Sequence, residues 1–287
     1  MARIHVVTDS GSDLPEKVRQ ELDIHVVPLS IQFGDEIYRD GIDLSVSEFY
    51  KRLQEDEVLP STCQPSPADF QAKYLEIAEP GDTILSIHLS SRLSGTYQSS
   101  VIAGTMVAEE GIKVINIDTK SASIGIGLVA VAAARLLKEG AALEEVLEKV
   151  NYAISEMQVF FVVDTLEYLR RNGRIGNAQA LLGTLLNIKP ILTLQDGVVS
   201  PLEKIRGKGR AIKRLKELAG QVRAKYPDKD LSVGLTHAMV PNEAEQLDAA
   251  LKEELSLKDD VILGLIGPTI GVHVGMGTMA VLIHPKM

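Results

Sequence analysis

In the first half of the chain, short apolar runs of β-forming residues alternate with segments that have helical spacing. The strand-like runs lie at 3–7, 25–33, 82–88 and 112–118. Helices are predicted to begin at Ser45, where Glu48 completes the capping-box spacing, and at Ser66, which is followed by Pro67. Residues 34–41 are rich in turn formers, so we expect an excursion there. Strands that alternate with helices of this length indicate βαβ units and a mainly parallel, three-layer α/β/α sheet.

The second half of the chain has a different pattern. Residues 189–205 are typical of a hairpin that turns at Asp196-Gly197. Helices are predicted at 143–157, 210–225 and 242–255, and further strands at 158–164, 231–237, 261–267 and 278–284. These elements predict an α/β layer with a mixed sheet. The length of 287 residues favours two domains, which we place at 1–155 and 156–287.

Composition and charge limit the class of protein. Hydrophobic residues make up 45% and charged residues 24%, as in ordinary globular proteins, and the net charge of −9 argues against nucleic acid as a partner. The single cysteine, Cys63, excludes an internal disulfide and a cysteine-based zinc site and fits a reducing compartment. The longest apolar run, 124–134, is too short to cross a bilayer. The N-terminal residues lack the apolar stretch of a secretory signal, so we expect a cytoplasmic protein without stable membrane insertion.

Positive charge is concentrated in one segment of this acidic chain. Residues 166–216 hold eleven Lys and Arg against three acids, a local charge of +8. Such asymmetry predicts a docking face. No aromatic residues are interleaved for stacking on bases, which again disfavours nucleic acid.

Candidate chemistry lies in loops rich in hydroxyl residues. The chain lacks a GxxxxGK[ST] phosphate loop, an HExxH motif, a GxSxG elbow and a GxGxxG turn after a strand. It has hydroxyl-rich segments at 8–15, 61–70 and 90–100, and a glycine-rich segment at 267–277. Such loops meet at the carboxyl ends of the strands in open α/β sheets, where ligands bind. Ser94 is placed to cap the next helix, whose free N–H groups attract an anion. The alternative for each loop is simple helix capping, and His273 of the last segment is compatible with a structural role.

Six motifs taken together resemble the DegV family of bacterial fatty-acid-binding proteins. They are VTDSGSDLP (7–15), STCQPSP (61–67), SSRLSGTYQSS (90–100), RRNGRIG (170–176), KPIL (189–192) and GVHVGMG (271–277). The resemblance covers essentially the whole chain. It implies a two-domain architecture related to the dihydroxyacetone kinase substrate-binding fold, with a long-chain fatty acid held between the domains. In members that work with a fatty acid kinase, the carboxylate is presented for phosphorylation to an acyl phosphate.

The resemblance also implies roles for particular residues. The family's carboxylate contacts carry over onto Thr62 and Ser94, and His273 occupies the position of the family's C-terminal histidine. No catalytic residue, metal or cofactor is implied, only the bound fatty acid. Three positions depart from the family's pattern: Cys63 where Ser is usual, and Val274 and Met276 where Thr and Pro are frequent. Whether Val274 and Met276 alter the rigidity of the loop around His273 is left open by the sequence.

Physical chemistry divides the expected ligand into two parts. About fifteen buried carbons gain roughly 12 kcal/mol at ~0.8 kcal/mol per methylene, before the costs of binding, so the tail dominates affinity. The aliphatic helices expected at 124–137 and 178–188 are predicted to wall the tail. The carboxylate costs several kcal/mol to desolvate unless it is hydrogen-bonded. We expect neutral donors without a fixed cation such as Arg, which leaves the carboxylate oxygen nucleophilic toward ATP.

The basic segment then has a predicted partner. An acidic surface of the ATP-binding kinase subunit, or the ATP phosphates, would be met by Arg170, Arg171, Arg174, Arg206, Lys208 and Arg210.

Two other functions remain open at the level of sequence. One is a serine-dependent acyl hydrolase or transferase with Ser94 as nucleophile, His273 as base and Asp9 as acid. The other is a sensor whose lipid occupancy controls a partner.

Overall fold

The first half of the protein contains the predicted parallel sheet. The structure, a computed structural model, describes residues 3–56, 58–183 and 188–286. Four strands lie in the order β2-β1-β6-β7. They are β1 (Ile4–Asp9), β2 (Ile24–Val27), β6 (Thr83–His88) and β7 (Lys113–Asp118). Every pair is parallel, so the loops that follow the strands gather at one edge of the sheet.

A second, antiparallel sheet in the same half was missed from sequence. It has the order β4-β3-β5 and consists of β3 (Ser30–Phe33), β4 (Glu36–Arg39) and β5 (Ser61–Cys63). The prediction of one strand over 25–33 is wrong, because Pro28 separates β2 from β3 and offers no N–H to a ladder. The expected excursion at 34–41 is instead largely strand β4, which pairs with β3.

The second half forms the predicted mixed sheet, in the order β10-β9-β8-β13-β11-β12. Its strands are β8 (Gln158–Val162), β9 (Ile188–Gln195), β10 (Val198–Arg206), β11 (Leu231–His237), β12 (Ile262–Leu265) and β13 (Met279–Pro285). Only the pairing of β11 with β12 is parallel. The predicted hairpin is confirmed: Asp196 and Gly197 have φ of 47° and 77°, the positive values of a type I′ turn.

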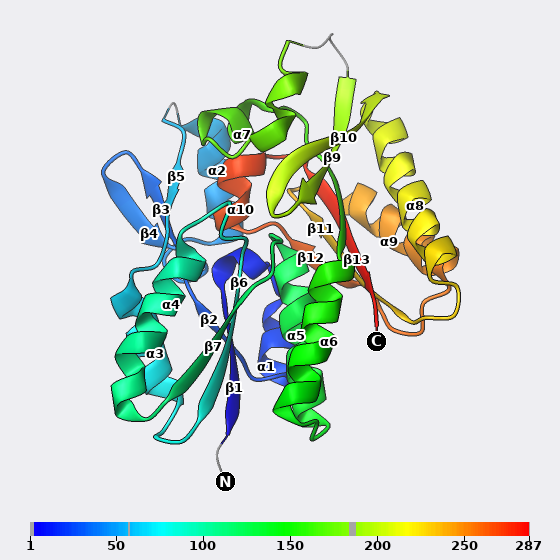
Figure 1. The fold of residues 1–287 in the computed structure, drawn as a ribbon. Helices are drawn as coiled ribbons and strands as arrows, with labels where there is room; N and C mark the ends of the chain where they lie inside the picture. The colour runs from blue at the N-terminus through cyan, green and yellow to red at the C-terminus, as the bar shows by residue number, and fades with distance from the viewer. Residues whose placement is uncertain (1–2, 57, 184–187, 287) are drawn as a thin grey trace.

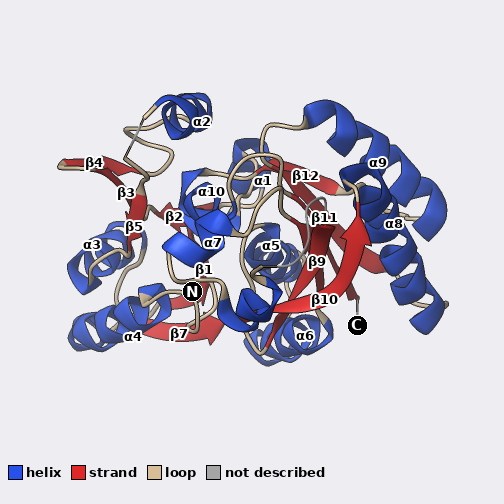
Figure 2. Ribbon diagram, turned by 90° about the horizontal axis from the view of Figure 1, so that it is seen from above, coloured by secondary structure: helices blue, strands red, loops and turns tan. Residues whose placement is uncertain are grey.

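Helices cover both sheets, as Figures 1 and 2 show. They are α1 (Glu16–Glu21), α2 (Val46–Glu55), α3 (Pro67–Ile77), α4 (Thr96–Val107), α5 (Ile124–Lys138), α6 (Leu143–Glu156), α7 (Glu167–Arg171), α8 (Lys208–Lys225), α9 (Pro241–Leu255) and α10 (Pro268–Val274). On one face of the parallel sheet, α3 contributes Phe70 and Tyr74 to a core that includes Val7 and Ile84. Helices α8 and α9 cover the outer face of the mixed sheet. The chain is thus α/β, with a parallel sheet, a mixed sheet and the small antiparallel sheet β4-β3-β5.

Helix α5 lies between the two large sheets and contacts both β1 and β11. This position explains why the run 124–134 is apolar almost all round: ten residues of α5 are buried. The same hydrophobic cluster contains side chains from the parallel sheet, from α5 and from the mixed sheet. The domain limits 1–155 and 156–287 stay a prediction; α6 ends at Glu156 and β8 begins at Gln158.

The contact of α5 with β11 generates a first prediction. A Cβ added at Gly234 of β11 would lie 2.5 Å from Cγ2 of Ile124, so the helix must shift to admit it. We expect Gly234→Ala to lower the free energy of unfolding by about 1–3 kcal/mol, as measured by urea denaturation. The matched control is Gly209→Ala in α8, where nothing lies within 4 Å of the added carbon. Equal stability of the two variants would contradict close packing at this crossing.

Candidate functional site

An apolar pocket lies between the loop edge of the parallel sheet and the inner face of the mixed sheet. Its floor is formed by four strands of the mixed sheet, through Val159, Phe161, Leu194, Val199, Ala280 and Leu282. Its other walls come from the loops and from α10, and include Leu89, Leu93 and Ile270. A mostly apolar pocket with a few convergent polar groups is the usual form of a small-molecule site.

The expected walls of the pocket need correction. No residue of the predicted helix 124–137 lines it; Ala122 and Ser123, just before α5, do. Residues 176–181 form a 3-10 helix and not the start of the helix predicted at 178–188, and they do not line the pocket either. Residues 184–187 of that prediction lie outside the described residues. The sequence pattern identified the aliphatic character of the wall but not the strands that supply it.

The three residues named from the resemblance all line this pocket. Thr62 lies on β5, Ser94 precedes α4, and His273 lies on α10. The Oγ1 atom of Thr62 is 3.1 Å from Nε2 of His273, although the two residues are 211 positions apart. The glycine-rich segment that contains His273 was expected to be a loop; residues Pro268–Val274 are a helix. The structure therefore brings these side chains together without yet assigning them a ligand.

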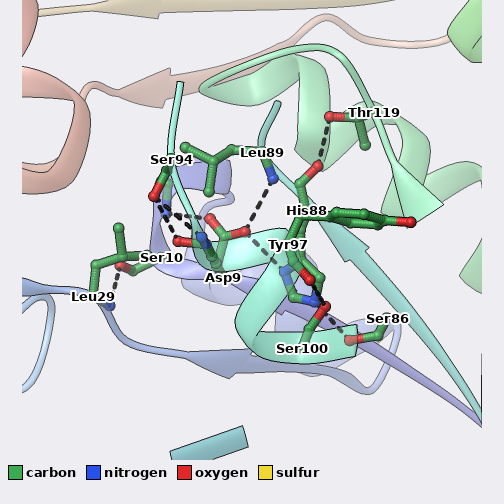
Figure 3. A network of polar contacts seen from close by, with 12 residues as sticks. Asp9, Ser10, Leu29, Ser86, His88, Leu89, Ser94, Tyr97, Ser100 and Thr119 are labelled. Carbon is green, nitrogen blue, oxygen red and sulfur yellow. Dashed lines mark hydrogen bonds and ion pairs between the residues drawn. The ribbon is translucent and has the colours of Figure 1, made fainter. Parts of the chain in front are cut away.

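Ser94 is held by the start of α4. Its Oγ accepts the N–H of Thr96 at 3.3 Å and lies 2.9 Å from the hydroxyl of Thr96. The N-cap position itself is Gly95, which provides no side-chain cap. Ser94 is therefore not the N-cap residue, although its hydroxyl accepts the first N–H of the helix. Figure 3 shows Ser94 beside Ser10 and Asp9 at the loop edge of the sheet.

Two buried carboxylates hold the helix that carries His273. The Oδ1 atom of Asp13 accepts the N–H of Gly267 at 2.8 Å, and Oδ2 of Asp40 accepts the N–H of Thr269 at 3.1 Å. Burial raises the pKa of both carboxyl groups, although hydrogen bonds from Ser123 to Asp13 and from Thr269 to Asp40 oppose this. Sequence reasoning missed both roles. Asp13 lies in the first hydroxyl-rich loop, but nothing in the sequence marked Asp40.

The imidazole of His273 is neutral at pH 7. Burial lowers its pKa to about 4, and the charge of Arg174 adds to the effect. Its Nδ1 is buried and, within the described part of the chain, has no hydrogen-bond partner. A buried polar atom of this kind is costly unless something binds it. The ring therefore has one nitrogen on Thr62 and one that is open to a ligand or water.

Arg174 lies on the pocket wall, so a cation borders a site for which only neutral donors were expected. Its Nε donates to the carbonyl of Leu93 at 3.1 Å, and its Nη1 donates to the carbonyl of Asn172 at 2.7 Å. Asn172 in turn donates to the carbonyl of Val272 in α10. The sequence reveals the positive charge of residues 166–216 but does not reveal that the side chain of Arg174 faces the pocket.

The other predicted docking residues lie around the C-terminal end of α10. Helix α7 contacts α10, and a Cβ at Gly277 would meet both Asp164 and Lys208. Arg170 and Arg171 pair with Glu167, and Lys208 pairs with Asp164. Arg206 and Arg210 are exposed, and no carboxylate of the described residues lies within ion-pair distance of either.

The departures from the family's pattern do not disturb the pocket's polar end. Cys63 is exposed and does not line the pocket. Val274 is a buried lining residue at the end of α10, and Met276 packs against the main hydrophobic cluster. The region around His273 is thus fixed by helix and core contacts.

The catalytic triad considered from sequence is not assembled. Asp9 is fully buried; its Oδ2 lies 2.9 Å from Nδ1 of His88 and accepts the N–H of Leu89, and its Oδ1 accepts the N–H of Gly11 (Figure 3). His88 continues this network to Ser86. Neither Ser94 nor His273 is among these partners, so a hydrolase with Asp9 as its acid is not supported.

The described residues contain no arrangement typical of a metal site or of a membrane span. No group of three or more His, Cys, Asp or Glu is arranged to hold a metal ion. In the same ranges, every helix is too short or too polar to cross a bilayer.

The fold and the pocket define an α/β protein with a few polar groups gathered on an apolar cavity. Residues 3–286 match the family model described as "Uncharacterised protein, DegV family", and the chain belongs to the DegV family. A fatty-acid-binding DegV family protein from Thermus thermophilus, known from its solved structure, is 36% identical, with 99% of each chain covered and a TM-score of 0.85.

Two further solved structures have the same fold. DegV from Bacillus subtilis, described as a fatty acid binding protein, is 32% identical over 100% of both chains with a TM-score of 0.89. A stearic-acid-binding protein from Eubacterium ventriosum is 26% identical, covers 100% of this chain and 99% of its own, and also has a TM-score of 0.89.

The lowered pKa of His273 predicts a pH dependence of stability. Between pH 6.5 and about 4 the unfolded chain binds a proton on this ring and the folded protein does not, so stability falls as the pH falls through this window. At pH 5 the loss from this group is about 2 kcal/mol relative to neutral pH. His273→Gln keeps a hydrogen-bonding side chain and removes the titration. Urea denaturation at pH 7 and pH 5 should show the smaller loss in the variant; equal losses would contradict a neutral, buried ring.

Proposed function

We propose that this protein binds a long-chain fatty acid, with its acyl chain on the inner face of the mixed sheet and its carboxylate at Thr62, Ser94 and His273. The observation that carries the proposal is the meeting of these three polar side chains, from distant segments, on one apolar pocket. The fatty acids named for the related structures from Thermus thermophilus, Bacillus subtilis and Eubacterium ventriosum support it. The exposed, free thiol of Cys63 is compatible with the reducing cytoplasm where we expect the protein to act.

The polar end suits a carboxylate. The side chain of Arg174 borders Leu93 and raises the local positive potential, as its effect on the pKa of His273 indicates. The open Nδ1 of His273 and the hydroxyl of Ser94 provide hydrogen-bonding positions. Because a bound anion favours the imidazolium, ligand binding would raise the pKa of His273. At this polar end of the pocket, hydrogen bonds and positive potential offset the cost of desolvating a carboxylate.

We further propose that the bound carboxylate is presented to a separate ATP-binding kinase subunit. Its oxygen attacks the γ-phosphorus of ATP, the bond to the β–γ bridging oxygen breaks, and acyl phosphate and ADP result. Two N–H positions of Arg174 already donate to carbonyls, so the guanidinium is not arranged as a bidentate clamp. The carboxylate therefore keeps a lone pair for attack, and this chain supplies binding and not catalysis.

A double substitution tests the carboxylate site. Thr62→Ala with Ser94→Ala should weaken binding of hexadecanoate by about tenfold or more, since hydrogen bonds to a charged group are each worth ~1.5–3 kcal/mol. Binding of hexadecanol, which has the same chain and no charge, should change much less. Isothermal titration calorimetry measures both.

The matched control is Ser47→Ala with Thr105→Ala, two exposed hydroxyl residues that do not line the pocket. It should bind both ligands as the wild type does. If hexadecanoate and hexadecanol lose affinity equally in the site variant, the three residues shape the cavity but do not recognise a carboxylate.

A second substitution tests docking of the kinase. Arg206→Ala with Arg210→Ala removes two exposed cations of the predicted docking set, neither of which has an ion-pair partner in the described ranges. The double substitution should weaken the complex with the ATP-binding fatty acid kinase subunit by roughly tenfold at low salt. High salt should erase the difference, because screening removes the same attraction. Lys17→Ala with Lys225→Ala, exposed cations elsewhere, is the control. Binding that is independent of salt and of all four cations would refute this docking face.

A further inference from the structure

The pocket has a direction along the strands of the mixed sheet. Thr278, Ala280 and Leu282 lie at alternate positions on one face of the β13 region and all line the pocket. The hydroxyl of Thr278 donates to the carbonyl of Val274 at 3.0 Å, so Thr278 lies at the His273 end. At about 3.4 Å per residue, Leu282 lies roughly 13 Å further along. An acyl chain with its carboxylate at His273 therefore runs toward Leu282.

A row of aliphatic side chains crosses the sheet at this far end. Leu282 pairs with Val159, and Leu194 pairs with Val199. The pairing of Phe161 with Leu192, continued by two residues, places Val159 opposite Leu194. All four members of the row line the pocket: Val199, Leu194, Val159 and Leu282.

A second pocket lies behind two members of this row. Val159 and Leu194 line it as well, and they are the residues shared by the two pockets. The rest of its lining is mostly polar, with Thr119, Lys120, Asn151 and Ser155. Within this second pocket, Nζ of Lys120 lies 3.4 Å from Oδ1 of Asp196, and both side chains are exposed. Val159 is 7% exposed and Leu194 is half-buried, so a single layer of side chains separates an apolar cavity from a polar, charged one.

We propose that Val159 and Leu194 form a partition that sets the longest acyl chain this protein accepts, an inference that rests on the proposed fatty acid function. Up to the partition, each buried methylene improves affinity by about fourfold. A longer chain has to push its end into a close-packed row or into contact with Lys120, Asn151 and Ser155. Affinity should therefore rise with chain length to a limit and then fall.

The experiment measures dissociation constants for a series of saturated fatty acids that differ by two carbons. In Val159→Ala and in Leu194→Ala the limit should move to longer chains, with roughly tenfold tighter binding than wild type for the first acid beyond the wild-type limit. Val162→Ala is the matched control, because Val162 lies on the same strand but belongs to the core on the opposite face. It should keep the wild-type profile at a comparable loss of stability.

A second ligand distinguishes two explanations for a longer limit: an opening between the two pockets, or only a larger apolar cavity. An unbranched α,ω-dicarboxylic acid longer than the wild-type limit places its second carboxylate in the pocket of Lys120. It should bind to the Val159→Ala/Leu194→Ala double variant and not to the wild type, and Lys120→Ala added to the double variant should weaken it several-fold. Rejection of the diacid by the double variant would overturn the connection between the two pockets.

The outcomes separate the two proposals. If the wild type binds no fatty acid of any length, the proposed function fails. Suppose instead that the wild type binds fatty acids up to a length limit, and that Val159→Ala and Leu194→Ala have the same limit as the control Val162→Ala. The fatty acid function then stands and the partition is wrong.

Discussion

The site depends on the attachment of α10 to the first half of the chain by buried hydrogen bonds. Asp13 and Asp40 accept the first N–H groups of this short helix, and the hydroxyl of Tyr50 donates to the carbonyl of Ile266 just before it. A helix of seven residues has little stability of its own, so these distant partners fix it. Figure 1 shows the result: α10, from near the C-terminus, lies beside α2, and the chain then continues into β13.

This attachment allows one cavity to satisfy two opposed demands. The inner face of the mixed sheet offers an aliphatic floor that could not solvate a charge. The imidazole comes to the same space from α10, the hydroxyl groups come from β5 and the loop before α4, and the guanidinium of Arg174 comes from the segment after α7. Burial keeps His273 neutral. The carboxylate of a fatty acid and its tail can thus be buried together, each against the wall that suits it.

The sequence pattern was informative where local chemistry decides the structure. Alternating strands and helices indicated the parallel sheet, and Asp196-Gly197 indicated the hairpin. The hydroxyl-rich segments at 61–70 and 90–100 indicated where the pocket lies, whereas the segment at 8–15 does not line it. It failed where distant contacts decide. The chain leaves the parallel sheet at Pro28, and the glycine-rich segment of His273 becomes helical only because Asp13 and Asp40 hold it. The inward turn of Arg174 depends on carbonyl acceptors near Leu93 and Asn172, which no spacing rule locates.

Mass spectrometry of the organic extract from the purified, natively folded protein tests the central claim most directly. The account predicts one long-chain fatty acid per molecule, retained through purification and released only on unfolding or extraction. An extract free of fatty acids, from a protein that also takes up no labelled hexadecanoate, would contradict it.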